Sequence, residues 1–299
     1  GYVKTMALSD FNAQGRGGKG VTGAKLKDED ALSHMIHTTA HAYLLFFSNK
    51  GKVYRLKAHE IPSASRTARG TSIVNLLPLN PDEKIQAVVD TRDYETNRFL
   101  FFATKNGRVK KTLFTAYDSS LKAGLIAIKL NEGDELVSVV PTNGSDHIFL
   151  VSSFGQTLRI DEENIRPMGR TAAGVNGMKF RADDHLVSCA VSEEKALLLH
   201  LTTEGFGKRT EIEEFAVKGR GGLGVRGIKT TESRGTVAGS LIVKDDDDIL
   251  AVTSSGKIIR LGVSEISIQG RDATGVRVMS PGEGEIITAV SPAPTDTEV

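Results

Sequence analysis

The residues best suited to chemistry lie in one glycine-rich, basic segment, Gln14-Gly15-Arg16-Gly17-Gly18-Lys19-Gly20. Its backbone can approach a phosphate closely because glycine has no Cβ, and its arginine and lysine supply positive charge. The glycines at 15, 17 and 20 match a dinucleotide-binding fingerprint, but no strand precedes them and no helix follows. Ala13 stands where a Walker A loop needs glycine. The segment therefore favours phosphates other than those of a bound nucleotide.

Other kinds of site are poorly supported. The acidic run at 245–248 lacks the spaced oxygen ligands and the glycine of a calcium loop, so we expect a solvated turn. His34, His37 and His41 do not have the spacing of zinc ligands. No Ser/His/Asp or Cys/His arrangement stands out. We expect this chain to carry no catalytic residue, no metal site and no cofactor.

The composition is that of an ordinary globular protein, with 39% hydrophobic and 25% charged residues in 299. A net charge of +1 does not indicate nucleic-acid binding, but it allows basic and acidic residues to occupy different faces. No apolar run approaches the ~18 residues that span a bilayer. The single cysteine, Cys189, cannot form an intrachain disulfide, which fits a cytoplasmic protein. The abrupt start at Gly1 suggests a piece of a longer chain.

A repeat organises the sequence. Each unit has an apolar run, a polar turn with glycine and a short basic strand, as in "YLLFFSNKGKVYRL" and "FLFFATKNGRVKKT". The start "GYVKT" fits the second half of this pattern. The turn glycines are Gly1, Gly51, Gly107, Gly155, Gly205 and Gly256, at a spacing near 50 residues. Such a period predicts a propeller-like array of small sheets.

The fold predicted from this repeat is all-β. We expect a six-bladed β-pinwheel or propeller of four-stranded antiparallel blades, as one domain over residues 1–290. The blades are expected near 1–42, 43–98, 99–146, 147–195, 196–248 and 249–290, with the first missing its leading strand. Helix is expected only as single turns in "AHEIP", "DEENIRPM" and "SEIS". Residues 291–299 have no apolar pattern and predict a disordered tail.

Basic residues recur at fixed distances from the turn glycines. Fifteen residues after the turn glycine, an Arg-x-x-x-Gly motif marks the entry to the third strand. In the third unit, Lys122 and Gly124 take the place of its arginine and glycine. Further basic residues follow the turn glycine by three or four positions. If the blades are alike, these residues form a belt around the circumference, which suits a regular polyanion such as duplex DNA. Without a recognition helix, such contacts would be independent of sequence. The candidate DNA-binding residues outside segment 14–20 are Lys4, Arg55, Arg66, Arg69, Lys110, Lys111, Lys122, Arg159, Arg170, Lys208, Arg209, Lys218, Arg220, Arg260 and Arg271.

Residues 14–20 closely resemble the box Gln-Arg-Arg-Gly-Gly-Lys-Gly of the C-terminal domain of the DNA gyrase A subunit. The six units are similar to the β-pinwheel of that family, and the resemblance covers the chain except its tail. It implies a non-catalytic domain that wraps duplex DNA about its rim, which lets an ATP-dependent type II topoisomerase introduce negative supercoils. It further implies a nucleoid-associated A2B2 enzyme, with an A-subunit dimer formed by other parts and a B subunit. The catalytic tyrosine, ATP and Mg²⁺ would lie on those other parts.

Two departures from the family pattern bear on the function. Gly15 replaces a basic residue of the box, which predicts a weaker hold on DNA. A near-copy, "KGRGGLG" at 218–224, predicts a second, weaker contact. The related domain of topoisomerase IV, which binds DNA without strong wrapping, stays an alternative, although its box is usually degenerate. A protein-interaction propeller fits less well, because the chain lacks tryptophan and its loops are basic and glycine-rich.

Overall fold

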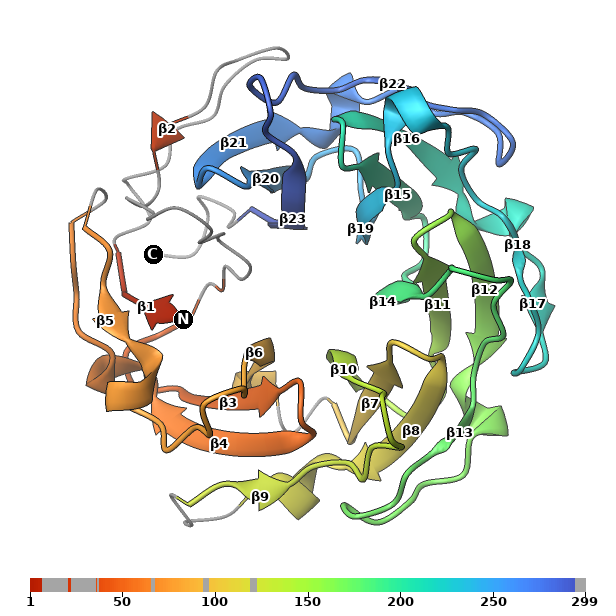
Figure 1. Ribbon diagram of the computed structural model, residues 1–299. Coiled ribbons are helices and arrows are strands. Elements are labelled where there is room, and N and C mark those ends of the chain that lie inside the picture. The colour runs from red at the N-terminus through yellow and green to blue at the C-terminus, as the bar shows by residue number, and fades with distance from the viewer. Residues whose placement is uncertain are drawn as a thin grey trace.

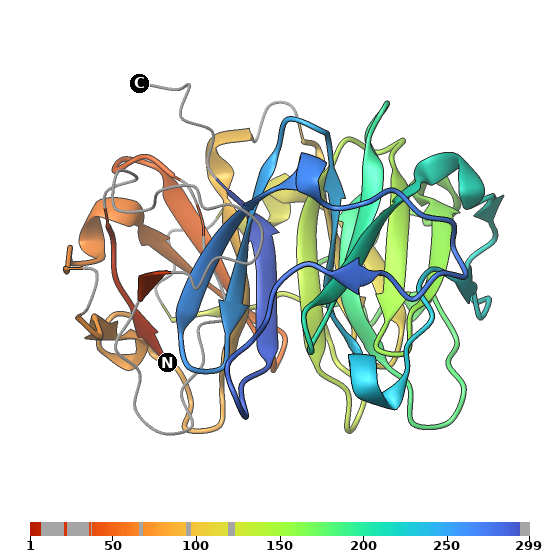
Figure 2. The ribbon, with the colours of Figure 1, turned by 90° about the horizontal axis from the view of Figure 1, so that it is seen from above.

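The chain folds into a ring of small sheets. The computed structural model describes residues 1–6, 21–22, 36, 38–65, 68–93, 97–118 and 123–293. Figure 1 views the ring along its axis and Figure 2 views it from the side, with strands running between its two edges. Among the described residues no helix has both the length and the apolar character to cross a membrane. The only helices there are single 3-10 turns.

Five blades share one plan. At the centre of each blade is an antiparallel hairpin closed by a turn glycine. The hairpins are β3 (Tyr43–Ser48) with β4 (Lys52–Lys57), β7 (Phe99–Thr104) with β8 (Arg108–Leu113), β11 (His147–Ser152) with β12 (Gln156–Asp161), β15 (Leu197–Thr202) with β16 (Phe206–Glu211), and β20 (Asp248–Thr253) with β21 (Lys257–Gly262).

One further strand lies on each side of every hairpin. The inner strands, toward the ring centre in Figure 1, are β6 (Ile85–Asp90), β10 (Leu136–Thr142), β14 (Leu186–Val191), β19 (Val237–Val243) and β23 (Ile287–Pro292). The short outer strands are β9 (Leu125–Ile126), β13 (Val175–Asn176), β18 (Val225–Arg226), β22 (Val276–Arg277) and β2 (Val21–Thr22), and β17 (Val217–Lys218) adds to the β12 blade in parallel.

The ring has two distinguishable edges. We name the edge at the hairpin turns, marked by glycines such as Gly107 and Gly155, the turn edge. At the opposite edge, here named the helical edge, a 3-10 helix follows each hairpin: η2 (Ala58–Glu60), η5 (Phe114–Tyr117), η6 (Glu162–Asn164), η7 (Ile212–Glu214) and η9 (Val263–Glu265). Three more turns are η3 (Ile73–Asn75), η4 (Thr91–Asp93) and η8 (Glu232–Arg234).

The expectation of six blades is wrong for the described residues, which form five. In place of a sixth, β1 (Tyr2–Val3) pairs only with β5 (Thr71–Ser72) in a two-stranded sheet. Most residues between β1 and β3 lie outside the described part of the chain.

The expected blade boundaries also need correction, because each outer strand comes from the next repeat. β9 belongs to the third repeat but pairs with β4 of the second, Val53 lying opposite Leu125. In the same way, β13 pairs with β8, β18 with β12 and β22 with β16, each in the preceding repeat. β2, near the start of the chain, pairs with β21 of the last blade, which joins the two ends of the ring. A blade is therefore not one continuous segment.

The last strand reaches further than expected. Ser291 and Pro292, predicted to begin a disordered tail, lie in β23 opposite Leu250 and Ile249. Ala293 is buried behind them. Proline is tolerated here because β23 is an edge strand of its sheet. Residues 294–299 lie outside the described part of the chain.

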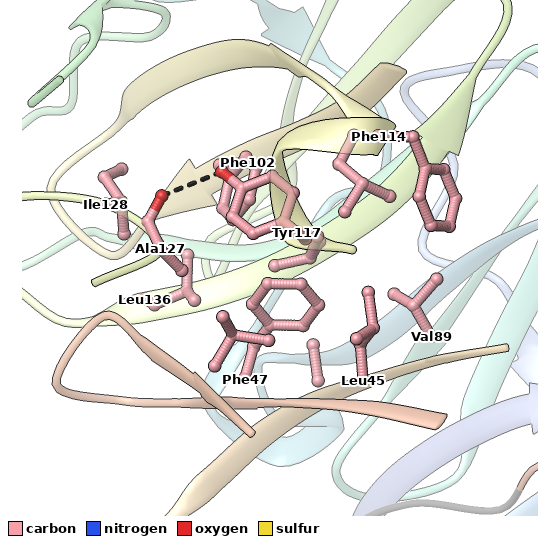
Figure 3. Close-up of a cluster of buried hydrophobic side chains, with 13 residues drawn as sticks. Leu45, Phe47, Val89, Phe102, Phe114, Tyr117, Ala127, Ile128 and Leu136 are labelled. Carbon is pink, nitrogen blue, oxygen red and sulfur yellow. Dashed lines mark hydrogen bonds between the residues drawn. The ribbon is translucent and has the colours of Figure 1, made fainter. Parts of the chain in front are cut away.

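The hydrophobic core lies between neighbouring blades. The first hairpin strands are buried on both faces, which explains why their sequences are continuous apolar runs rather than alternating ones. Leu45 and Phe47 of β3 pack with Phe102 of β7, while Leu44 and Phe46 contact a separate cluster. Tyr117 of η5 joins the first cluster, and its hydroxyl donates to the Ala127 carbonyl at 2.9 Å (Figure 3). Packing between repeats thus holds the ring together.

Candidate nucleic-acid interface

The box, Gln14 through Gly20, lies outside the described residues, as do Arg66 and Lys122. The structure does describe the two residues directly after the box. Val21 and Thr22 form the outer strand β2 opposite Ile258 and Lys257. The corresponding loops 169–174, 219–224 and 270–275 lead into β13, β18 and β22 in the same way. We name these three segments the rim loops.

The recurring glycine that ends each rim loop is needed by the backbone. Gly174, Gly224 and Gly275 all have φ between 73° and 82°, a conformation that disfavours residues with a Cβ. A Cβ on Gly174 would lie 2.3 Å from the Val109 carbonyl oxygen, and one on Gly224 would lie 2.6 Å from that of Thr157. The glycine of the Arg-x-x-x-Gly repeat is therefore needed for the outer strand to dock, and the arginine supplies the charge.

The lysines three residues after the turn glycine are structural. Lys110 and Lys208 are completely buried, contrary to the expectation of a surface belt. Lys110 donates to the carbonyls of Ala127 and Arg170, and Lys208 donates to that of Arg271 at 2.9 Å. Burial lowers the pKa of Lys110 to about 7 and that of Lys208 to about 8. Each ammonium thus ties its hairpin to the rim loop of the next repeat.

Lys4 makes the same kind of contact at the first repeat. Its ammonium donates to the carbonyls of Ser65 and Ala68 at 3.0 and 2.7 Å. Arg69, beside this loop, lies half-buried with its guanidinium 3.6 Å from the centre of the Tyr2 ring. Both side chains hold β1 against the second repeat.

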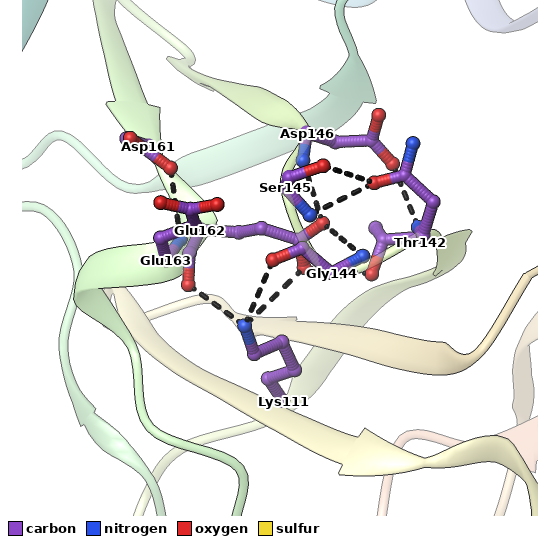
Figure 4. Close-up of polar contacts among 9 residues, drawn as sticks. Lys111, Thr142, Gly144, Ser145, Asp146, Asp161, Glu162 and Glu163 are labelled. Atoms are coloured by element: carbon purple, nitrogen blue, oxygen red, sulfur yellow. Dashed lines mark hydrogen bonds and ion pairs between the residues drawn. The ribbon is translucent and has the colours of Figure 1, made fainter.

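Lys111, four residues after its turn glycine, is buried at the helical edge. Its Nζ lies 3.8 Å from Oε2 of Glu162, which is itself inaccessible to solvent, and donates to the Glu162 carbonyl at 2.9 Å. The carboxylate also accepts from the Thr142 hydroxyl and from the amides of Gly144 and Asp146 at 2.8–2.9 Å (Figure 4). This network satisfies both charges internally, so Lys111 is not a surface contact.

The arginines four residues after the turn glycine also have partners within the fold. Arg55 pairs with Asp118 at 3.0 Å and stacks on Tyr43, and Arg209 pairs with Asp245 and donates to the Ile266 carbonyl. Arg159 donates to the carbonyls of Ile212 and Phe215, and Arg260 donates to Asp248 at 2.8 Å. Of these, Arg209 and Arg260 are buried. The expectation that this second series forms a belt for a polyanion is therefore wrong for its buried members.

The arginines of the rim loops lie on the outside of the ring. Each donates to the carbonyl of the second residue in the preceding outer strand: Arg170 to Ile126 at 2.7 Å, Arg220 to Asn176 at 3.2 Å and Arg271 to Arg226 at 3.4 Å. Arg220 is exposed and the other two are half-buried. These contacts fix the guanidinium groups at equivalent places on the rim and leave them open to solvent.

The near-copy of the box is the most accessible of the three rim loops. Lys218 in β17 and Arg220 are both exposed, and Leu223, which stands where the box has lysine, is 43% exposed. Gly221 has φ of 81°, and a Cβ there would meet nothing closer than 3.9 Å. β17 and the loop that follows it lie on the outer side of the ring (Figure 1), and the two exposed cations are Lys218 and Arg220.

A third basic series lies outside the two series predicted from the sequence. Lys129, Lys179 and Lys229 each lie five residues beyond the glycine before the outer strand, and all are exposed. Their spacing of 50 residues is visible in the sequence. These lysines follow the third strand of each unit, whereas the other two basic series precede that strand.

Comparison with known proteins gives one consistent result. The family model described as "DNA gyrase C-terminal domain, beta-propeller" matches residues 1–39, 42–91, 98–143, 146–193, 197–244 and 247–294. A curated relative, the DNA gyrase A subunit of Mycolicibacterium smegmatis, is 43% identical over 293 residues and aligns with 97% of this chain. The chain spans about a third of the length of the curated relatives it matches, 35% in that case.

Solved structures agree with the sequence matches. The structure of a DNA gyrase A C-terminal domain superposes with a TM-score of 0.86 and 28% identity, over 97% of this chain and 96% of that one. The C-terminal domain of a DNA topoisomerase IV superposes with a TM-score of 0.75 and 29% identity, over 89% of this chain and 84% of that one.

Proposed function

Because this chain belongs to the family of DNA gyrase A C-terminal β-propeller domains, we propose that it binds duplex DNA and wraps it around its outer rim. The observation that carries the proposal is the set of rim loops with their outward guanidinium groups. Equivalent cations on successive repeats suit a polymer with phosphates at regular intervals. The box directly precedes β2, as the rim loops precede the other outer strands. We therefore assign it the corresponding DNA contact, where the first and last repeats meet.

The contacts are directed to the DNA backbone. Arg170, Arg220 and Arg271 approach from loops and short outer strands, and the described residues contain no helix long enough to enter a major groove. Binding is therefore independent of base sequence. Bending DNA around a convex rim costs on the order of 1–6 kcal/mol per 20–30 bp, so several such contacts must act together to offset it.

In the complete protein, this wrapping serves ATP-dependent negative supercoiling. The domain is non-catalytic and requires no cofactor. Other domains of the A subunit supply the dimer and the cleavage site, and the B subunit of an A2B2 enzyme supplies ATP hydrolysis. The enzyme acts in the cytoplasm on nucleoid DNA. These roles are supported by the family membership and by the length of the relatives, of which this chain spans about a third.

Two other functions are less well supported. A weakly wrapping domain of the topoisomerase IV type agrees less with the higher structural similarity to the gyrase A domain, 0.86 against 0.75 in TM-score. A protein-interaction propeller agrees less with a rim made of cationic loops. Gel shifts in rising salt separate this last alternative, because only a DNA-binding domain should show strong, salt-sensitive affinity.

The test of wrapping is a change in DNA linking number. The 299-residue chain is added to relaxed plasmid, topoisomerase I relaxes the unconstrained turns, and the protein is then removed. We expect plasmid with altered linking number, in proportion to bound protein. An unchanged linking number at saturating protein would refute wrapping.

The test of the box is charge reversal at Arg16 and Lys19. Arg16→Glu and Lys19→Glu together should remove supercoiling by the reconstituted enzyme while leaving relaxation without ATP intact. Lys195→Glu with Lys244→Glu, two exposed lysines outside the rim loops, is the matched control. Supercoiling retained by the box variant would contradict the assignment of the box.

A further inference from the structure

The lysines of the third basic series lie at a defined place on the ring. After each outer strand the chain passes the hairpin turn, where the amides of Ile128 and Met178 donate to the carbonyls of Gly51 and Gly107 at 3.1 and 3.0 Å. Lys129 and Lys179 are the next residues. In the following repeat Gly227 donates to the Gly155 carbonyl at 2.8 Å, two residues before Lys229. All three lysines therefore lie at the turn edge.

The same lysines adjoin the rim loops. Their backbone amides donate to carbonyls within the loop of the next repeat, Lys129 to Ala172 at 3.3 Å, Lys179 to Gly222 at 2.9 Å and Lys229 to Ala273 at 3.0 Å. Each lysine thus lies beside the loop that presents Arg170, Arg220 or Arg271. The two series therefore lie side by side in three successive repeats, with the exposed Asp272 in the last of the three rim loops.

These ammonium groups are available to a ligand. Lys129, Lys179 and Lys229 are exposed, and none of them forms an ion pair with another residue in the described ranges. This contrasts with Lys110, Lys111 and Lys208, which are buried with partners. Exposed cations without a protein partner can release counterions when they meet phosphates.

Carboxylates lie at both edges of the ring, and the helical edge carries many of them. Exposed carboxylates lie on its 3-10 helices, Glu163 on η6, Glu213 and Glu214 on η7 and Glu265 on η9. A loop at the same edge adds the exposed Asp245 and Asp246. The turn edge carries exposed carboxylates as well, such as Asp82, Glu132 and Asp183 before the inner strands, so it is the lysines beside the rim loops that offer a place for phosphates.

We propose that the DNA wrapped by this domain runs along the turn-edge side of the rim, on a track formed by Lys129, Lys179 and Lys229 beside the rim loops. The proposal rests on the proposed DNA-binding function, and it assigns the axial position of the DNA on the ring and three phosphate contacts.

The test compares two triple variants of the chain that remove equal charge. Lys129→Gln, Lys179→Gln and Lys229→Gln together remove the track. Arg166→Gln, Lys195→Gln and Lys244→Gln together remove three exposed cations outside it, at or near the helical edge. Affinity for a long linear duplex is measured by fluorescence anisotropy over a salt series, after circular dichroism has verified folding. Single variants at positions 129, 179 and 229 serve if the triple variant does not fold.

The expected result is a change in the salt dependence of binding. Loss of three phosphate contacts should make the slope of log K against log salt less steep by about 2.7, and each single variant by about 0.9. The control should keep the slope of the unaltered chain. An unaltered chain that does not bind DNA refutes both the proposed function and the track. Binding with the same slope in the track variant, or an equal change in the control, refutes the track alone.

Discussion

Lysines of the same sequence motif have different roles because strand geometry places their side chains on different faces. Lys110 and Lys111 are adjacent in β8, yet Lys110 contacts the rim loop of the next repeat and Lys111 contacts Glu162 at the helical edge. Lys179 follows an outer strand instead and is exposed. A lysine's charge alone therefore does not identify it as a DNA contact. A buried lysine holds parts of the fold together, whereas an exposed one is free to meet a ligand.

Replacing Lys111 tests its structural role. Lys111→Met leaves the carboxylate of Glu162 buried without a cationic partner, which should lower the free energy of unfolding by about 3–5 kcal/mol. Adding Glu162→Gln should recover part of that loss, because no buried charge then remains. Urea unfolding of the single and double variants measures both effects. A Lys111→Met variant of normal stability, or one with a weaker salt dependence of DNA binding, would contradict this assignment.

At the scale of elements, the sequence predicts strands better than it predicts their partners. The single helical turns expected in "AHEIP", "DEENIRPM" and "SEIS" are confirmed as η2, η6 and η9. The apolar runs form the first hairpin strands, as in β3 and β7. The pairing of the two-residue outer strands is not predicted in this way. Their partners lie in another repeat, and the local sequence does not specify which one.

Two glycines allow the energetic cost of an unfavourable backbone conformation to be measured apart from the cost of close packing. Gly107 has φ of 81°, and a Cβ there would lie 2.2 Å from the Met178 carbonyl oxygen. Gly133 has φ of 74° but nothing within 4 Å. Gly133→Ala should therefore cost about 1–2 kcal/mol, from conformation alone. Gly107→Ala should cost about 1–3 kcal/mol more, because the turn and the following repeat must separate. Thermal or urea unfolding compares them, and equal losses would contradict the packing argument.

At the scale of the whole molecule, the exchange of outer strands makes each repeat depend on the next. β2 completes the blade of β20, β21 and β23, so residues near both ends of the chain pair in one sheet. The box directly precedes β2. The DNA contact that we propose for the box would therefore act next to the join between the first and last repeats.

The pairing at this join can be tested by removing one backbone donor. Val21→Pro eliminates the amide of β2 opposite Ile258, whereas Val21→Ala retains it. Hydrogen exchange in the peptide covering residues 257–262 should be faster in the proline variant than in the alanine variant. Equal exchange in the two variants would mean that β2 does not close the ring in solution.

The sequence by itself determined the period of the repeat, the glycine turns, the doubly buried strands and the box that identifies the family. These features are local, because φ, strand alternation and charge are properties of a few neighbouring residues. Only the tertiary structure decided the rest. It showed that five blades form in the described residues, that each borrows its outer strand and that Lys110, Lys111 and Lys208 are buried. Burial and strand pairing depend on residues in other repeats, which no local pattern specifies.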